Sequence, residues 1–158
     1  MKTYVTENAI RRTMENVINR EIGCFTDEVN KAHNIYFLTD TDTERMNRFF
    51  KSINAKPINV EPFNISEKDL LIVFDSEIEL NDEFYYIVKN FKYSGGHVAA
   101  IVANRKLSYI KFVDELLGIN INQTDIKKYG TGKIFDEVVD KVLDEVDKRV
   151  LYFKKIVK

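Results

Sequence analysis

Apolar residues recur every three or four positions in several parts of the chain, and this spacing is typical of amphipathic helices. The first such stripe continues without interruption from residue 6 to residue 32, which predicts one helix of about seven turns. Further helices are predicted over residues 44–53, from residue 80 to a glycine stop at 94–96, over 108–116 and over 134–156.

Short apolar runs lie between these helices and predict strands over residues 34–38, 56–60, 70–74, 97–102 and 117–121. The run LLIVF at 70–74 is apolar at every position, as in a parallel strand that is covered on both faces. The alternation predicts a doubly wound, mostly parallel α/β sheet, a flavodoxin-like sandwich with a long helix at each end of the chain. We expect strands 34–38 and 70–74 to be adjacent and central, and residues 123–132 to form a loop.

Composition narrows the class of protein. The 158 residues suit a single domain spanning 1–158. Because 24 Lys and Arg face 25 Asp and Glu, no nucleic-acid partner is expected. No apolar run approaches the roughly 18 residues of a membrane span, and no apolar signal core begins the chain, so we expect a cytoplasmic protein with no membrane partner. The single cysteine, Cys24, excludes an internal disulfide and is expected to be an inert packing residue.

The order and spacing of these elements resemble the sugar isomerase (SIS) domain, closest in layout to the small hexulose-phosphate isomerases. EKDLLIVFDSEIEL stands where that family typically has D-L-L-I-x-I-S-G-S-G, and YGTG resembles the G-T before its last helix. HVAAIVANRKLSYIKFVDELLGI is similar to its next strand, helix and edge strand. The resemblance covers most of the chain. It implies a SIS-like fold, a sugar-phosphate ligand, aldose–ketose isomerisation and a homodimer or homotetramer.

The two turns that hold the sugar phosphate in the family differ here. The first is typically G-x-G-x-S, and the matching positions have lost both glycines; they are Thr39, Asp40, Thr41, Asp42 and Thr43. The second is typically S-x-S-G-x-T, and its serines have become carboxylates; the matching positions are Asp75, Ser76, Glu77, Ile78, Glu79 and Leu80. Because like charges repel at close range, we expect the second turn not to bind a sugar phosphate in the family's manner.

Both turns also contain a capping box, T-x-x-E at Thr41–Glu44 and S-x-x-E at Ser76–Glu79. Such side chains would satisfy the helix N–H groups that an anion otherwise uses. We expect ordinary capped helix starts, and the alternative is a ligand site. The residues that would form this site are Thr39, Thr41, Thr43, Asp75, Ser76, Glu77, Arg105 and Thr131.

An isomerase also needs a base, which the family tends to place as a Glu early in the last helix. The ungapped match puts Ile134 there, and Asp136 and Glu137 lie near it but out of register. These two acids are the candidate catalytic residues. The same helix carries apolar residues on more than one side, including Leu143 and Leu151, and this favours a homo-oligomer.

Five other polar residues have simpler interpretations. Arg105 and Lys106 follow the fourth strand on the ligand side, where they would bind an anion or, as we expect, pair with the nearby acids. The hydroxyl of Thr131 is expected to cap the last helix. His33 and His97 each precede a strand at the opposite edge, and we expect loop or surface histidines.

The acidic residues of the two turns are also compatible with other functions. Asp40 and Asp42 fit the D-x-D motif of the haloacid dehalogenase-like, Mg²⁺-dependent phosphatases, although the motif lies far from the start of the chain. Asp42 and Asp75 could serve as the acids of a receiver-like domain, although receivers lack the two flanking helices. With Glu77, these aspartates could also hold Mg²⁺ or Ca²⁺. Capping carboxylates are commoner, so we expect no metal and no cofactor.

The sequence therefore favours a degenerate SIS-like domain, which binds a carbohydrate derivative weakly or acts as a regulatory or assembly module. The first alternative is an active aldose–ketose isomerase of a sugar phosphate, and the second is the phosphatase-like or receiver-like domain.

Overall fold

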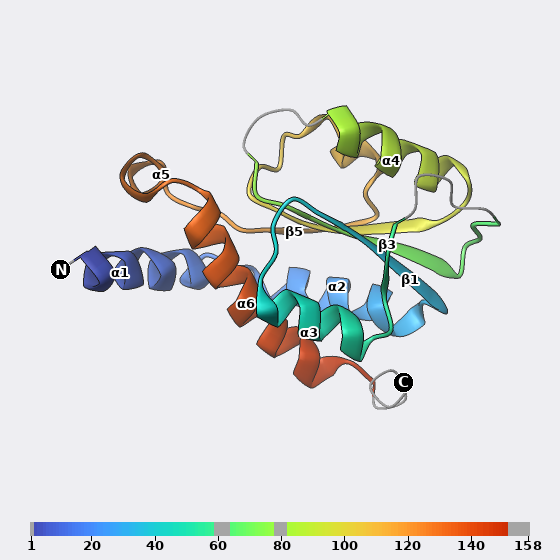
Figure 1. Ribbon diagram of the computed structural model, residues 1–158, viewed down its shortest axis with the longest axis horizontal. Helices are drawn as coiled ribbons and strands as arrows, with labels where there is room; N and C mark the ends of the chain where they lie inside the picture. The colour runs from blue at the N-terminus through green and yellow to red at the C-terminus, as the bar shows by residue number, and fades with distance from the viewer. Residues whose placement is uncertain (1, 59–63, 78–81, 152–158) are drawn as a thin grey trace.

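The computed structural model describes residues 2–58, 64–77 and 82–151. Within these ranges, five strands form one parallel sheet in the order β2-β1-β3-β4-β5 (Figure 1). The strands are β1 (Asn34–Thr39), β2 (Lys56–Pro57), β3 (Asp69–Asp75), β4 (His97–Val102) and β5 (Glu115–Gly118). The predicted doubly wound parallel sheet is confirmed, with β1 and β3 as neighbours at its centre.

Helices cover both faces of the sheet. The helices of the described ranges are α1 (Lys2–Glu15), α2 (Asn19–Lys31), α3 (Glu44–Ser52), α4 (Asp82–Tyr93), α5 (Gln123–Tyr129), α6 (Gly132–Arg149) and the 3₁₀ helix η1 (Ser108–Phe112). The helices α2, α3 and α6 lie on one face, and α4 and η1 lie on the other (Figure 1). α1 runs away from the sheet and contacts α6.

The side chains of β3 alternate between the two layers. Ile72 and Phe74 belong to the core under α2, α3 and α6, whereas Leu71 and Val73 belong to the core under α4 and η1. All four are fully buried, which explains why this strand is apolar at every position.

The leading stripe forms two helices rather than the single predicted one. α1 ends at Glu15, Ile18 is extended with φ −88° and ψ 116°, and α2 begins at Asn19. Residues 16–18 (Asn-Val-Ile) are weak helix formers, which favours a break there. Val17 still packs against the core, so the apolar period continues across the break and conceals it.

Long-range contacts explain two further differences from the predicted elements. Residues 123–129 form α5 rather than a loop, and the buried Asp125 on this helix pairs with Arg12 of α1 at 2.6 Å. β5 begins at Glu115 rather than 117, because Asp114 exchanges hydrogen bonds with Val98 and enters the sheet early. Helix 108–116 is accordingly shortened to η1.

The remaining boundaries differ at the ends of elements. α6 ends at Arg149, and residues 152–156 of the predicted helix lie outside the described ranges. The strand predicted over 56–60 is present as β2, with 59 and 60 likewise outside. None of the helices in the described ranges has the length and apolar character of a membrane span.

The wide apolar surface of α6 is used within one chain. Val138, Val139, Val142 and Leu143 are fully buried, because α6 packs against α1, α2 and α3. The apolar sides of this helix therefore do not require a second copy. The oligomeric state stays a prediction.

Candidate functional site

The strands β1 and β3 end side by side, and the chain leaves them toward opposite faces of the sheet. They pair in parallel up to Thr39 and Phe74. α3 follows β1 onto one face, and α4 lies after β3 on the other (Figure 1). In open parallel sheets, ligands bind outside the carboxyl ends of the strands at such a reversal. The turns at residues 39–43 and 75–77, here called the switch-point turns, are therefore the candidate site.

Asp40 joins the two switch-point turns. Its two carboxylate oxygens accept the N–H of Ser76 at 3.0 and 3.2 Å, and one of them accepts the Ser76 hydroxyl at 2.8 Å. The N–H of Asp40 donates to the carbonyl of Phe74 at 3.2 Å, which fixes the first turn to β3. Free N–H and hydroxyl donors at such a turn are where an anion would bind. Here a carboxylate of the protein itself accepts both donors of Ser76.

Asp75, the residue before Ser76, is fully buried. Its carboxylate accepts the hydroxyl of Tyr109 at 2.6 Å and the N–H of Glu77 at 2.9 Å. Burial raises the pKa of Asp75 to about 6 against the opposing effect of these hydrogen bonds, and the charges of Asp40 and Glu77 add to the rise. Burial and the adjacent Asp75 also raise the pKa of Tyr109, which therefore stays a hydrogen-bond donor.

α6 brings two more carboxylates to the first turn. The hydroxyl of Thr41 donates to Asp136, and the hydroxyl of Thr43 donates to Asp140 at 2.8 Å. Burial raises the pKa of both carboxyl groups, and the threonine hydrogen bonds oppose this effect. Of the two candidate bases, Asp136 is thus held against the site, whereas Glu137 is exposed.

The site carboxylates lack cationic partners in the part of the chain that the structure describes. No ion pair found there includes Asp40, Asp75 or Asp136. The same residues contain no group of His, Cys, Asp and Glu arranged to hold a metal ion. The carboxylate of Asp42, a member of the proposed cation pocket, instead accepts the amide of Asn47 at 2.7 Å. An anionic ligand at this site would therefore face negative charge.

Arg105 points away from the site and pairs elsewhere. Its Nη2 donates to both carboxylate oxygens of Glu21 at 2.7 and 2.9 Å, and its Nε donates to Asn120 at 3.2 Å. A Cβ on Gly118 would lie only 2.4 Å from this guanidinium, so the glycine makes room for it. Arg105 is paired as expected, but its partner is Glu21 of α2 rather than an acid of the switch-point turns.

The predicted capping box at Thr41–Glu44 is wrong. α3 begins at Glu44 with Thr43 as its N-cap, and the Thr43 hydroxyl accepts the N–H of Met46 at 3.1 Å. Thr41 lies two residues too early to cap this helix. Its backbone instead closes a turn with Thr39, whose hydroxyl donates to the carbonyl of Thr41 at 2.7 Å and accepts its N–H at 3.0 Å.

The cap predicted at Thr131 is also wrong, whereas the second capping box, Ser76–Glu79, stays a prediction. Thr131 makes no side-chain cap hydrogen bond, because its backbone is already helical, with φ −83° and ψ −42°. Glu79 of the second box lies outside the described residues, and the Ser76 hydroxyl is used by Asp40.

Two residues of the site were missed from sequence. Tyr109 lies 34 positions from Asp75 in a segment of ordinary apolar character, and no local pattern indicates the contact. Asp140 follows Asp136 by four positions, so it lies one helical turn further along the same face of α6. That spacing was a usable signal.

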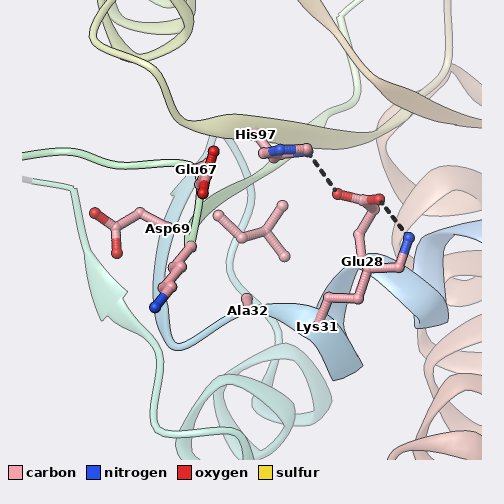
Figure 2. Close-up of a pocket in the computed structure, with 8 residues that line it drawn as sticks. Glu28, Lys31, Ala32, Glu67, Asp69 and His97 are labelled. Atoms are coloured by element: carbon pink, nitrogen blue, oxygen red, sulfur yellow. Dashed lines mark ion pairs between the residues drawn. The ribbon is translucent and has the colours of Figure 1, made fainter.

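A small pocket of about 110 Å³ lies at the other edge of the sheet (Figure 2). Its lining residues are Glu28, Lys31, Ala32, Glu67, Lys68, Asp69, Leu70 and His97. Glu28 pairs with Nδ1 of His97 at 3.2 Å and with Lys31 at 3.8 Å. His97 therefore lies away from the switch-point turns, as predicted, and its ring is occupied by an ion-pair partner.

The sequence matches no protein-family model and no curated protein. The fold, in contrast, is similar to several solved structures. The sugar isomerase domain of the RpiR transcription factor from Sphaerobacter thermophilus superposes with a TM-score of 0.67 at 11% identity, over 93% of this chain and 88% of that one.

Two other structures extend the comparison. One is MJ1247 of Methanococcus jannaschii, whose structure infers a function of 3-hexulose-6-phosphate isomerase; its TM-score is 0.64 at 16% identity, over 98% of this chain and 95% of that one. The Vibrio vulnificus NanR protein complexed with ManNAc-6P gives 0.60 at 14% identity, over 94% of this chain and 64% of NanR. At these identities the likeness concerns the fold alone. The chain has the fold of a sugar isomerase domain, and the predicted resemblance in fold is confirmed.

Proposed function

We propose that the protein is a degenerate SIS-type domain that binds a carbohydrate derivative weakly, without phosphate contacts of the family type, and acts as a regulatory or assembly module. The observation that carries this proposal is the contact between Asp40 and Ser76. Both donors of Ser76, the N–H and the hydroxyl, are given to a carboxylate of the chain itself. A phosphate at this turn would have to displace that carboxylate.

The energetics favour the carboxylate over the phosphate. A carboxylate within roughly 4 Å of a phosphate costs on the order of a few kcal/mol at intermediate dielectric. That cost is comparable with the roughly 1.5–3 kcal/mol that a hydrogen bond to a charged group contributes. Arg105, a cation that could have offset the repulsion, is paired with Glu21. The balance therefore disfavours a sugar phosphate held by Ser76.

A role outside catalysis is consistent with the structural neighbours. The sugar isomerase domain of a transcription factor has this same fold. A domain of this kind can transmit ligand binding or assembly without transferring a proton. The carbohydrate hydroxyls could still bind the threonines and carboxylates of the switch-point turns, which accept hydrogen bonds.

One observation supports the alternative, an active aldose–ketose isomerase. The carboxyl group of Asp136 lies at the first turn, and burial raises its pKa toward the range that suits a general base. An isomerase of this kind would lose its activity in Asp136→Asn. The proposal instead expects no interconversion of fructose 6-phosphate by the wild type, followed by NMR of the sugar.

Calorimetric titration with fructose 6-phosphate tests the proposal directly. We expect no binding tighter than about 100 μM by the wild type, and a gain of affinity in Asp40→Ala, which frees the donors of Ser76. Asp42→Ala is the matched control, because it removes the same charge from the same turn without touching Ser76. Tight binding by the wild type that Asp40→Ala weakens would contradict the proposal.

The module is expected to assemble as a homodimer or homotetramer. Two apolar side chains remain about half exposed near the ends of α2 and α6, Ile18 at 46% and Leu151 at 47%. Light scattering across micromolar concentrations measures the mass. A value that stays at the 18.5 kDa of one chain would rule out this assembly.

A further inference from the structure

The outer face of α4 exposes aromatic rings around a lysine. Tyr86 and Tyr93 are 61% and 71% exposed, although both are large apolar side chains. Lys89 lies between them in the sequence, with its Nζ 5.8 Å from the ring centres of both Tyr85 and Tyr93. The inner face of the same helix carries Phe91 into the core and Tyr85 packs against that core, whereas Tyr86 and Tyr93 do not belong to it.

η1 adds a second lysine and a supporting ring to this surface. The Nζ of Lys111 lies 5.7 Å from the ring centre of Tyr85 and 5.4 Å from that of Phe112. The ring of Phe112 meets Tyr85 and Tyr93 edge to face, with centres 5.7 and 5.5 Å apart. We call the combined surface the Tyr–Lys patch; its residues are Tyr85, Tyr86, Lys89, Tyr93, Lys111 and Phe112.

The contacts between the rings hold the side chains of this patch in place before a partner binds. Because the aromatic side chains already hold one another in place, a partner would have to order few of them. The patch is also positively charged. Neither Lys89 nor Lys111 takes part in any ion pair found among the described residues. Exposed cation–π contacts contribute only about 0.5–1 kcal/mol, so both ammonium groups can still pair with a carboxylate.

We propose that the Tyr–Lys patch is a docking surface for an acidic peptide segment of another protein. Tyr86 and Tyr93 are seven positions apart on α4, which places them about 10 Å apart along the helix. Two apolar side chains of the segment would pack on these rings. Carboxylates beside them would pair with Lys89 and Lys111, so charge and apolar contact select the same partner.

Other occupants fit the patch less well. A second copy that docked through the same patch about a twofold axis would bring its Lys89 and Lys111 against those of the first copy. A nucleic acid would need more lysines, because its affinity depends on neutralising many phosphates, and the chain carries a net charge of −1. The patch lies on the α4 face and involves none of the switch-point residues, so this inference is independent of the proposed function.

Selection from a random peptide library displayed on phage tests the inference. Peptides are selected on the wild type and counter-selected on Lys89→Glu/Lys111→Glu. We expect enriched peptides to combine several Asp or Glu residues with two apolar residues. In fluorescence anisotropy, the best synthetic peptide should bind the wild type about tenfold or more tightly than the charge-reversed variant or Tyr86→Ser/Tyr93→Ser.

The matched control is Lys127→Glu/Lys128→Glu on α5, which makes the same change in net charge at two exposed lysines. It should bind the peptide as the wild type does, and all variants should keep the unfolding temperature of the wild type. The inference is overturned if no acidic peptides are enriched or if the control loses affinity equally. Binding of a short oligothymidylate at the patch, or self-association that the patch variants abolish, would also overturn it.

Discussion

The two halves of α6 use aspartates of similar spacing in opposite ways. Near its start, Asp136 and Asp140 accept hydrogen bonds from threonine hydroxyls of the first switch-point turn. One and two turns further on, Asp144 and Asp147 pair with the guanidinium of Arg45 at 2.8 and 3.3 Å. The helix, its neighbour α3 and the residue type are the same. Only the partner changes, from a neutral donor to a cation.

The guanidinium of Arg45 forms ion pairs with Asp144 and Asp147, and it affects Asp140 only through a weaker effect that lowers the pKa of that carboxyl group. A cation stabilises a carboxylate by Coulomb attraction, whereas a hydroxyl gives a hydrogen bond and leaves the negative charge in place. Burial therefore raises the pKa of Asp136 and Asp140, as it does that of Asp75. No ion pair among the described residues offsets the charge of Asp40, Asp75 or Asp136, which is the opposite of what a phosphate site needs.

The largest expected effect of this difference is on the pH dependence of stability. Asp75 binds its proton more tightly in the folded protein, with a pKa of about 6, than at its ordinary value of 3.8. The folded state therefore loses stability as the pH rises from about 4 to about 6, by up to about 3 kcal/mol. Asp75→Asn should remove most of this loss. Urea unfolding at pH 4 and pH 8 measures it, and Asp42→Asn is the control that removes an exposed carboxylate from the neighbouring turn.

A smaller effect is expected from the donor that Asp75 receives. Tyr109→Phe removes the buried hydroxyl and leaves the carboxylate with one fewer hydrogen bond, at a cost on the order of 1–3 kcal/mol. The loss should be larger at pH 8, where Asp75 is ionised, than at pH 5. Tyr36→Phe on β1 is the control. Equal losses at the two pH values would show that Tyr109 matters only for packing.

At the other end of α6 the effect should be smallest and should depend on salt. Arg45→Gln removes the cation shared by Asp144 and Asp147, whose side chains are 63% and 34% exposed. We expect a loss of about 1 kcal/mol at low ionic strength, which added salt reduces. Unfolding in low and high salt measures it. A loss that salt leaves unchanged would mean that Arg45 contributes packing rather than charge.

The helices and strands could be predicted from the sequence where burial alone determines them. β4 begins and ends at His97 and Val102 as predicted, because HVAAIV is buried on both faces. Elements that depend on contacts with distant residues could not be predicted. α5 depends on the pair of Arg12 with Asp125, 113 positions apart, and the break at Ile18 leaves no mark in the apolar period.

The same distinction between local patterns and distant contacts applies to the candidate site. The acidic turns could be located because each comes directly after a predicted strand. Which donor each acid receives could not be predicted, since Ser76 and Tyr109 are brought to Asp40 and Asp75 by the sheet and by η1. Likewise the partner of Arg105 depends on α2, which passes beside β5.

The central claim is that the carboxylate of Asp40 occupies the anion position at Ser76. ¹H–¹⁵N NMR of the Ser76 amide tests it most directly, with inorganic phosphate and fructose 6-phosphate as the added anions. In the wild type the amide resonance should stay in place as either anion is added, whereas in Asp40→Ala it should shift with saturation, and in Asp42→Ala it should behave as in the wild type. A wild-type Ser76 amide that shifts and saturates with phosphate would contradict the account.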